Sequence, residues 1–219
     1  MRLEKQLPFA HLILENEGKF NATSLQSFNS CLDEALADDS VQALLITGED
    51  KIFAQGLDLE YLSNEPPDAA MAFVHNCMRA VGRLLAFPVP VVSAVNGHAF
   101  GLGAMITLAS DYAVMRRDRG YFCLPEIDLG MNLIPSMNAL VCAKLDGRNL
   151  RDVLLTGKRV GGDEAVARGI VDASCAMAEL LDVGAGLAEP MMGKDRQTLA
   201  QLKRGANLSV LAVVEAPGA

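Results

Sequence analysis

The most constraining stretch of the chain is residues 87–111, FPVPVVSAVNGHAFGLGAMITLASD. Residues 89–95 form a β-branched apolar run interrupted by one proline, which predicts a buried strand. Asn96 and Gly97 predict a turn, and residues 104–109, after two further glycines, predict a helix. A strand, a glycine turn and a helix in succession leave free backbone N–H groups at the helix N-terminus. Such groups stabilise negative charge on a ligand.

The glycine spacing of this stretch limits which ligand it could hold. The glycines stand at positions 97, 101 and 103, which is not the G-x-G-x-x-G spacing of a dinucleotide-binding turn, and no phosphate-loop lysine accompanies them. A tight strand-to-helix turn without a ligand is the simpler alternative, and this stretch alone leaves it open.

Composition excludes several classes of protein. With 219 residues, 51% of them hydrophobic, the chain can build one sizeable core with an appendage. Its net charge of −8 argues against a general nucleic-acid binder. The five cysteines lack C-x-x-C spacing and predict reduced thiols of an intracellular protein, and the three scattered histidines predict no metal site. No signal peptide or membrane span is expected.

The order of strand and helix signals predicts an α/β fold. Residues 9–15 and 41–47 have the pattern of strands, and a capped helix is predicted between them over residues 21–37. Strand, helix and strand in succession favour parallel pairing through crossovers. We expect a core domain over residues 1–173 and a helical C-terminal region over residues 174–219.

A second glycine turn lies in residues 53–59, FAQGLDL. Gly56 follows a predicted strand, and Leu57 is expected to start a helix or turn with its N–H unpaired. If this turn lies beside Gly101, the N–H groups of Leu57 and Leu102 converge on one oxygen. Two such donors stabilise an enolate or a tetrahedral oxyanion, each by roughly 3 kcal/mol. Spacing by itself does not establish the convergence.

Several motifs are spread over about residues 10–173. They are residues 53–59, residues 88–97 (PVPVVSAVNG), Gly101-x-Gly103, Asp111, Pro125-Glu126 and residues 156–172 (TGKRVGGDEAVARGIVD). Together these motifs resemble the crotonase (enoyl-CoA hydratase/isomerase) superfamily. The run of residues 111–130, and Gly-Leu-Asp-Leu at residues 56–59, are similar to Δ3,Δ2-enoyl-CoA isomerases of the plant peroxisomal type.

The resemblance implies a crotonase-like spiral of ββα units with a helical C-terminal region that builds a homotrimer or a dimer of trimers. It implies an acyl-CoA thioester substrate whose oxygen lies between the N–H groups of Leu57 and Leu102. It implies no cofactor, coenzyme A being part of the substrate, and no nucleic-acid or membrane partner. The positions that match the substrate groove are Phe53, Ala54, Gln55, Gly56, Asp58, Leu59 and Gly101.

The acidic residues of the family separate its reactions. Hydratases of this superfamily use two glutamates, of which the second matches Glu126 and the first matches Met105. The acid of dienoyl isomerases and dehalogenases would fall near Ile134 or Pro135. One carboxylate therefore remains, in an apolar loop that should raise its pKa towards that of a useful base. A single base suits a proton shuttle, so we expect a Δ3,Δ2-enoyl-CoA isomerase with Glu126, Leu57 and Leu102 as catalytic groups.

Alternatives remain at each level. Another crotonase-type activity (hydration, thioester hydrolysis or decarboxylation) and a non-catalytic acyl-CoA-binding homologue compete with isomerisation. Glu126 could be a surface acid, and Asp128 and His98 are interpreted as structural. Lys203 and Arg204 could reach the phosphates of coenzyme A or could be solvated. Relatives commonly run longer, so the lid is expected to be reduced or supplied by a neighbour. The lack of a C-terminal peroxisomal tripeptide favours a cytoplasmic location.

Overall fold

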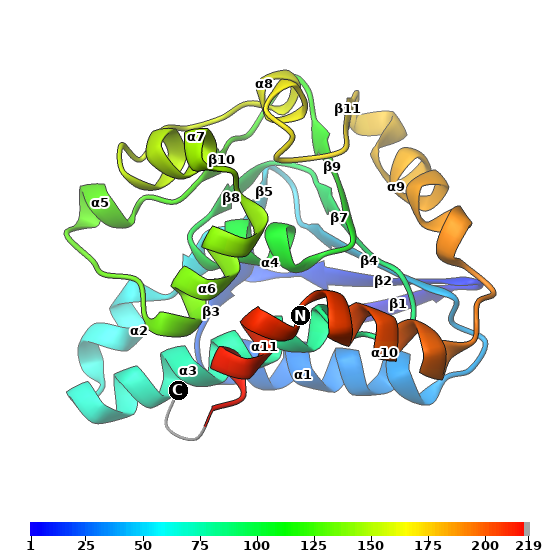
Figure 1. The fold of residues 1–219 in the computed structure, drawn as a ribbon, viewed down its shortest axis with the longest axis horizontal. Coiled ribbons are helices and arrows are strands. Elements are labelled where there is room, and N and C mark those ends of the chain that lie inside the picture. Colours follow the sequence, from blue (N-terminus) through cyan, green and yellow to red (C-terminus); the bar gives the residue numbers. More distant parts are fainter. Residues whose placement is uncertain (217–219) are drawn as a thin grey trace.

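A computed structural model describes residues 1–216 as a mixed α/β fold built on one six-stranded sheet (Figure 1). All neighbouring strands pair in parallel except the first two, which are antiparallel. The strands, in the order in which they pair, are β1 (Arg2–Gln6), β2 (Phe9–Leu14), β4 (Ala43–Gly48), β7 (Val91–Val95), β9 (Tyr112–Arg116) and β11 (Ala173–Cys175).

Shorter strands form two small sheets beside the large one. The first has the order β10 (Phe122–Cys123), β8 (His98–Phe100) and β5 (Ile52–Ala54), and the second pairs β3 (Lys19–Phe20) with β6 (Gly56–Leu57). Along the chain, each of β2, β7 and β9 is followed by one short strand and then by a helix, and β4 is followed by two short strands, β5 and β6, and then by α2. The α/β class is therefore confirmed, and the predicted ββα unit recurs four times.

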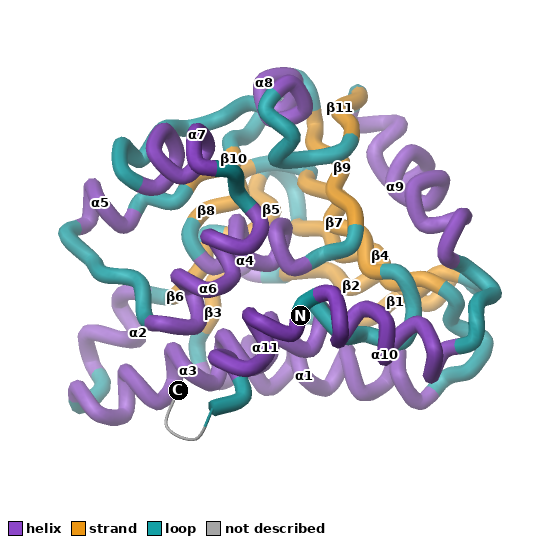
Figure 2. The backbone as a smooth tube through the Cα atoms, in the orientation of Figure 1, coloured by secondary structure: helices purple, strands orange, loops and turns teal. Residues whose placement is uncertain are grey.

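The helices surround the strands (Figure 2). The first six are α1 (Ala22–Ala37), α2 (Leu59–Asn64), α3 (Pro67–Leu84), α4 (Leu102–Ala109), α5 (Glu126–Leu129) and α6 (Pro135–Lys144). The others are α7 (Gly147–Asn149), α8 (Gly162–Ala167), α9 (Leu180–Ala188), α10 (Arg196–Ala206) and α11 (Leu208–Val214), with shorter helical turns at residues 16–18, 150–154, 177–179 and 189–191. None of the helices in residues 1–216 is long and apolar enough to cross a membrane.

The large sheet is buried on both faces, which explains why its central strands are almost continuously apolar. Leu44 and Ile46 of β4 point into the main core, towards α1, α3 and α4. Ala43 and Leu45 of the same strand point to the other face, against α9. Alternation along the strand therefore fills two apolar layers at once.

Local signals in the sequence explain the start of α1. The Asn21 side chain accepts a hydrogen bond from the Ser24 N–H at 3.1 Å, and the Ser24 hydroxyl accepts one from the Asn21 N–H at 2.8 Å. This reciprocal cap confirms the predicted helix start. At the start of α3, Pro66 holds the N-cap position and Asp68 lies in the first turn.

The C-terminal helices are part of the same body as the strands. Lys203 of α10 is only 7% exposed, and its Nζ lies 2.6 Å from Asp111 Oδ2. Both alternatives for Lys203, a coenzyme A ligand and a solvated residue, are therefore wrong, since its ammonium group is buried between Asp111 and the Val89 oxygen just before β7. Gly184 and Gly186 lie inside α9. The predicted assembly role of residues 174–219 stays a prediction, and residues 217–219 lie outside the described part.

Candidate active site

The two glycine turns that were expected to converge lie against each other. A Cβ built on Gly56 would stand 2.7 Å from the carbonyl oxygen of Phe100 and 2.9 Å from the backbone nitrogen of Leu102. Gly56 also has a φ of +94°, a conformation that side chains disfavour. Glycine is therefore required here on two grounds, and its absence of a side chain lets β6 touch the start of α4.

Leu57 lies in a strand and does not start a helix, which corrects the sequence-based expectation. It pairs with Phe20 of β3, and the next N–H, that of Asp58, donates to the Phe20 oxygen at 2.9 Å. Successive N–H groups of a strand point to opposite sides, so that of Leu57 points away from β3. The helix begins at Leu59, where Asp58 Oδ1 accepts from the Tyr61 N–H at 3.2 Å. Asp58 thus caps α2.

The N-terminus of α4 supplies the second donor. Gly101 is the N-cap with φ +52° and ψ −115°, and no side chain caps this helix. The first intrahelical bond is donated by Met105 to the Gly101 oxygen at 3.0 Å. The N–H groups of Leu102, Gly103 and Ala104 therefore have no acceptor in the preceding turn, and the positive end of the helix is available to an oxygen atom.

A chain of close glycine contacts keeps this turn in place. A Cβ on Gly103 would lie 2.6 Å from the Ala54 oxygen, and one on Gly18 would lie 2.5 Å from the Ala54 Cα. Ala54 is thus held between the turn before β3 and the first turn of α4. Nothing in the local sequence around Gly18 pointed to this contact, because its partner is 36 positions away in the chain.

Glu126 is the acid that faces the turn. It opens the one-turn helix α5, and a Cβ on Gly101 would lie 3.6 Å from its Oε1. Its other oxygen, Oε2, is buried without a hydrogen-bond partner within residues 1–216. Burial raises the pKa of this carboxyl above its ordinary value of 4.5, against a smaller opposing effect of its own backbone N–H. An acid with a raised pKa and a free oxygen is suited to accept and return a proton.

The other predicted groove residues differ in exposure. The side chains of Phe53 and Ala54 are fully buried, so they lie in the core beneath the turn. Gln55 is exposed, and its Nε2 donates to Glu17 Oε2 at 2.8 Å. Leu59 is 45% exposed at the start of α2. The sequence motif therefore splits into a buried half that supports the turn and an exposed half that can meet a ligand.

A hollow adjoins the exposed half of this motif. Its volume is about 350 Å³, and it opens between the start of α1 and the capped start of α2. Its lining mixes hydroxyl, amide and charged groups with two apolar side chains. The residues are Met1, Asn16, Lys19, Asn21, Ala22, Thr23, Ser24, Ser27, Asp58 and Tyr61.

Met105 and His98, the other two residues considered from the sequence, have packing roles. Met105 is fully buried in the main core, and no acid stands in its place. His98 of β8 packs its ring against Phe100 and Tyr121, with centroids 5.2 and 5.6 Å away. Burial, with smaller effects of Arg159 and Arg119, lowers the pKa of His98, which suits a neutral packing role.

The sequence matches a family model described as enoyl-CoA hydratase/isomerase over residues 13–213. Since the match spans most of the chain, this protein belongs to the enoyl-CoA hydratase/isomerase family. Among its relatives is enoyl-CoA delta isomerase 3 of Arabidopsis thaliana, 36% identical over 73% of this chain and 69% of the relative. The predicted resemblance to plant isomerases is thereby confirmed.

Two further relatives define the range of the similarity. Carnitinyl-CoA dehydratase of Escherichia coli is 32% identical over 76% of this chain and 63% of the relative. The structure of an enoyl-CoA isomerase from Mycobacterium tuberculosis superposes with a TM-score of 0.88 over 97% of this chain and 93% of that one, at 23% identity. At that identity the second match establishes the fold alone, and it confirms the crotonase-like architecture.

Proposed function

We propose that this protein is a Δ3,Δ2-enoyl-CoA isomerase that converts a 3-enoyl-CoA into the trans-2-enoyl-CoA. The observation that carries the proposal is the position of Glu126. Its buried carboxylate faces Gly101, and Gly101 lies against the turn at Gly56. One acid therefore stands opposite the place where two backbone donors approach each other. The plant delta isomerases among its relatives support the same reaction.

The reaction needs one base and one oxygen site. Glu126 takes a proton from C2 of the substrate, the C–H electron pair forms the C1=C2 bond of a dienolate, and the carbonyl π pair moves to the thioester oxygen. The N–H groups of Leu57 and Leu102 bind this oxygen, on which the negative charge collects. The protonated Glu126 then gives the proton to C4, where the C3=C4 pair forms the new C–H bond, while the C1=C2 pair becomes the C2=C3 bond and the oxygen restores the carbonyl. The reaction consumes no water and needs no oxidant or reductant.

Burial of Glu126 assists both halves of the shuttle. A raised pKa brings the proton affinity of the Glu126 carboxylate closer to that of the substrate carbanion at C2. The free energy of the first proton transfer is therefore less unfavourable. The same protonated carboxyl is then a ready donor at C4. In this proposal the polar part of coenzyme A lies along the exposed Gln55 and Leu59 and the half-buried Asp58, and Lys19 in the adjoining hollow faces its phosphates.

Hydration is the main competing reaction, because a dehydratase also belongs to the relatives. The buried Met105 occupies the position that matches the first hydratase glutamate, and a thioether cannot orient or deprotonate water. Thioester hydrolysis, decarboxylation and simple binding of acyl-CoA remain as further outcomes of the test. None of them has an observation of its own in this structure.

The test offers the protein two substrates and follows the absorbance of the conjugated thioester. A rise with 3-hexenoyl-CoA and no loss with 2-butenoyl-CoA is the expected result. Loss with 2-butenoyl-CoA would indicate a hydratase, and release of free coenzyme A thiol would indicate a hydrolase. If the protein binds 3-hexenoyl-CoA and forms no conjugated product, the proposal is wrong.

We further propose that the protein assembles as a homotrimer or a dimer of trimers. Its C-terminal helices carry large apolar side chains at the surface, which a neighbouring copy would bury. Leu202 of α10 is 67% exposed, Leu208 of α11 62% and Leu181 of α9 40%. Light scattering at micromolar concentration measures the mass, and a monomer would contradict this proposal.

A further inference from the structure

Gly157, in a motif to which the proposed reaction assigns no role, touches the helix that carries Glu126. A Cβ built on Gly157 would lie 2.7 Å from Asp128 Oδ2 and 3.3 Å from Ile127 Cγ2. Asp128 and Ile127 are the two residues that follow Glu126 in α5. The bare backbone of Gly157 is therefore in direct contact with the short helix behind the acid.

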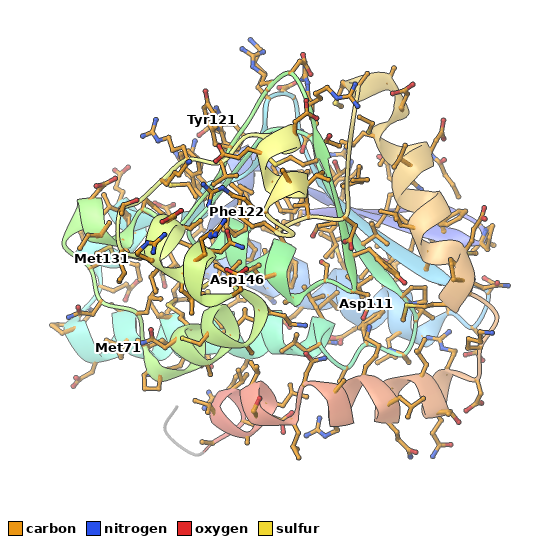
Figure 3. The ribbon with its side chains drawn as sticks, turned by 45° about the horizontal axis from the view of Figure 1, so that its top comes forward. Met71, Asp111, Tyr121, Phe122, Met131 and Asp146 are labelled. Atoms are coloured by element: carbon orange, nitrogen blue, oxygen red, sulfur yellow. The ribbon has the colours of Figure 1, made fainter. Side chains whose placement is uncertain are left out.

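The segment around Gly157 is fixed to the small sheet. Phe122 of β10 and Val160 exchange two backbone hydrogen bonds, of 2.8 and 2.9 Å. The buried thiol of Cys123 donates to the Gly157 oxygen at 3.4 Å. Figure 3 shows Phe122 towards the centre of the molecule and Tyr121 towards its edge, and Phe122 is fully buried. Gly157 is thus tied to the same strand that leads, three residues later, into Glu126.

The helix α5, in contrast, has little of its own to hold it. It consists of one turn, has no side-chain cap and contains no buried residue. Ile127 is 54% exposed and Leu129 is 50% exposed, so neither anchors it in the core. A single helical turn is not stable alone. Its orientation must come from the neighbours against which it rests.

We propose that Gly157 is a positioning residue for Glu126. The space left by its missing side chain holds Asp128 and Ile127, and this contact sets where the carboxylate stands relative to Gly101. The inference rests on the proposed function, because it takes Glu126 as the base. It predicts that a side chain at position 157 displaces α5 and turns the carboxylate away from the substrate.

Displacement of α5 should also be visible in the pH dependence of the reaction. The groups that surround Glu126 are Asp128 on its own turn and Cys123 of β10, with Arg159 beside that thiol. Burial raises the pKa of both Glu126 and Cys123. If α5 moves outwards, water reaches the carboxylate and its pKa falls. Because the base acts when deprotonated, the acid limb of kcat/KM then moves to lower pH.

The experiment compares Gly157→Ala with Gly169→Ala in the full chain. The two glycines have φ values of +63° and +68°, so both substitutions strain the backbone alike, but no atom lies within 4 Å of a Cβ at Gly169. Gly157→Ala should lower kcat for 3-hexenoyl-CoA by about 10- to 100-fold with KM little changed, since a small misplacement of a reacting group has effects of that order. Its acid limb should move to lower pH, while Gly169→Ala should keep the wild-type kcat.

A second substitution tests the contact itself. Asp128→Ala removes the carboxylate that the new Cβ would meet, so the Gly157→Ala, Asp128→Ala double variant should recover most of the kcat and the original acid limb. Asp128→Ala alone leaves Ile127 against Gly157, so it should lower kcat by less than Gly157→Ala does. If Gly157→Ala does not fold, Asp128→Leu presses a branched side chain on Gly157 without backbone strain and should lower kcat in the same way.

Failure of this inference differs from failure of the proposed function. If Glu126→Gln isomerises at the wild-type rate, the proposed function is wrong. If Glu126→Gln is inactive while folded Gly157→Ala or Asp128→Leu keeps the wild-type kcat, only the positioning role is wrong. An equal loss in Gly169→Ala, or no recovery in the double variant, would also overturn it.

Discussion

The two sides of the candidate site are built in opposite ways. On the donor side, all eight residues of α4 are buried, and Gly56 and Gly103 bring other backbone segments into contact with its first turn. On the acid side, α5 is a single exposed turn that carries one buried carboxylate oxygen. The donors are therefore part of the core, whereas the acid stands on a surface element. Substitutions on the first side should lower stability and activity together, and those on the second side should lower activity without lowering stability.

The largest effect is expected from Gly56→Ala. Its Cβ would meet the Phe100 oxygen and the Leu102 nitrogen, and the positive φ adds strain, so the free energy of unfolding should fall by about 3 kcal/mol or more. Displacing a donor should lower kcat by roughly 10²- to 10³-fold. Urea unfolding and the 3-hexenoyl-CoA assay measure both quantities.

The control for Gly56→Ala is Gly193→Ala. Gly193 has a φ of +67° and no neighbour near a built Cβ, so this variant carries the backbone strain alone, about 1–2 kcal/mol. It should keep the wild-type kcat. If Gly56→Ala lost stability and kept its kcat, the donor side would be structural only.

Glu126→Gln should lower kcat by about 10²-fold or more, while 3-hexenoyl-CoA still binds. Its stability should behave in the opposite way to that of Gly56→Ala. The pKa of Glu126 is raised in the folded protein, so its contribution to stability is present at low pH and is lost as pH rises through the folded pKa. The variant should therefore be at least as stable as the wild type near neutral pH, and the difference should disappear in acid.

The matched control for Glu126→Gln is Glu60→Gln, at an exposed acid in the first turn of α2. It should change neither kcat nor the pH dependence of stability. Urea unfolding at several pH values separates the two variants. A Glu126→Gln protein that is less stable than the wild type at neutral pH would contradict the comparison.

Gly101→Ala tests both sides of the site at once, because Gly101 belongs to the donor turn and faces the acid. The nearest atom to its Cβ is Glu126 Oε1 at 3.6 Å, which is an ordinary contact distance. Backbone strain remains, because a φ of +52° with a ψ of −115° lies outside the left-handed helical region, so we expect a loss of about 1–3 kcal/mol and less than a tenfold fall in kcat. A loss of activity as large as that of Gly56→Ala would show that the turn tolerates no adjustment.

The smallest expected effect is a shift of the acid limb of the wild-type kcat/KM profile from the ordinary pKa of a glutamate. Since burial raises the pKa of Glu126, the limb should lie above pH 4.5, the ordinary value for this carboxyl. Steady-state rates over a series of buffers at constant ionic strength locate it. An acid limb below pH 4.5 would indicate a solvated carboxylate.

The donor and acid positions could be predicted because their motifs are local. The pattern around Gly56 and Gly101 indicates two turns, and the family resemblance assigns the acid to Glu126. The long strands and α1 were likewise predictable from apolar runs and from the Asn21 cap. The two- and three-residue strands such as β6 and β8 were not, because segments that short have no periodicity.

Contacts between distant segments were beyond the sequence pattern. The space that Gly157 leaves for Asp128 depends on how α5 meets the turn at Gly157, and the sequence of neither segment reveals this contact alone. Lys203 has the character of a solvated surface residue in its own helix, and it is buried because Asp111 lies opposite. Such contacts are decided by the assembled fold, which is why local rules fail there.

The buried contact of Lys203 has a consequence for how the chain folds. It joins residues 92 positions apart, and the bonds from Asn207 to the Leu85 oxygen and from Arg196 to the Asp38 oxygen span 122 and 158 positions. Closing loops of that length costs chain entropy before any contact offsets it. We expect docking of α10 and α11 to be the slow, late step of folding, with the sheet assembled first and α3 and α6 covered only when these helices arrive.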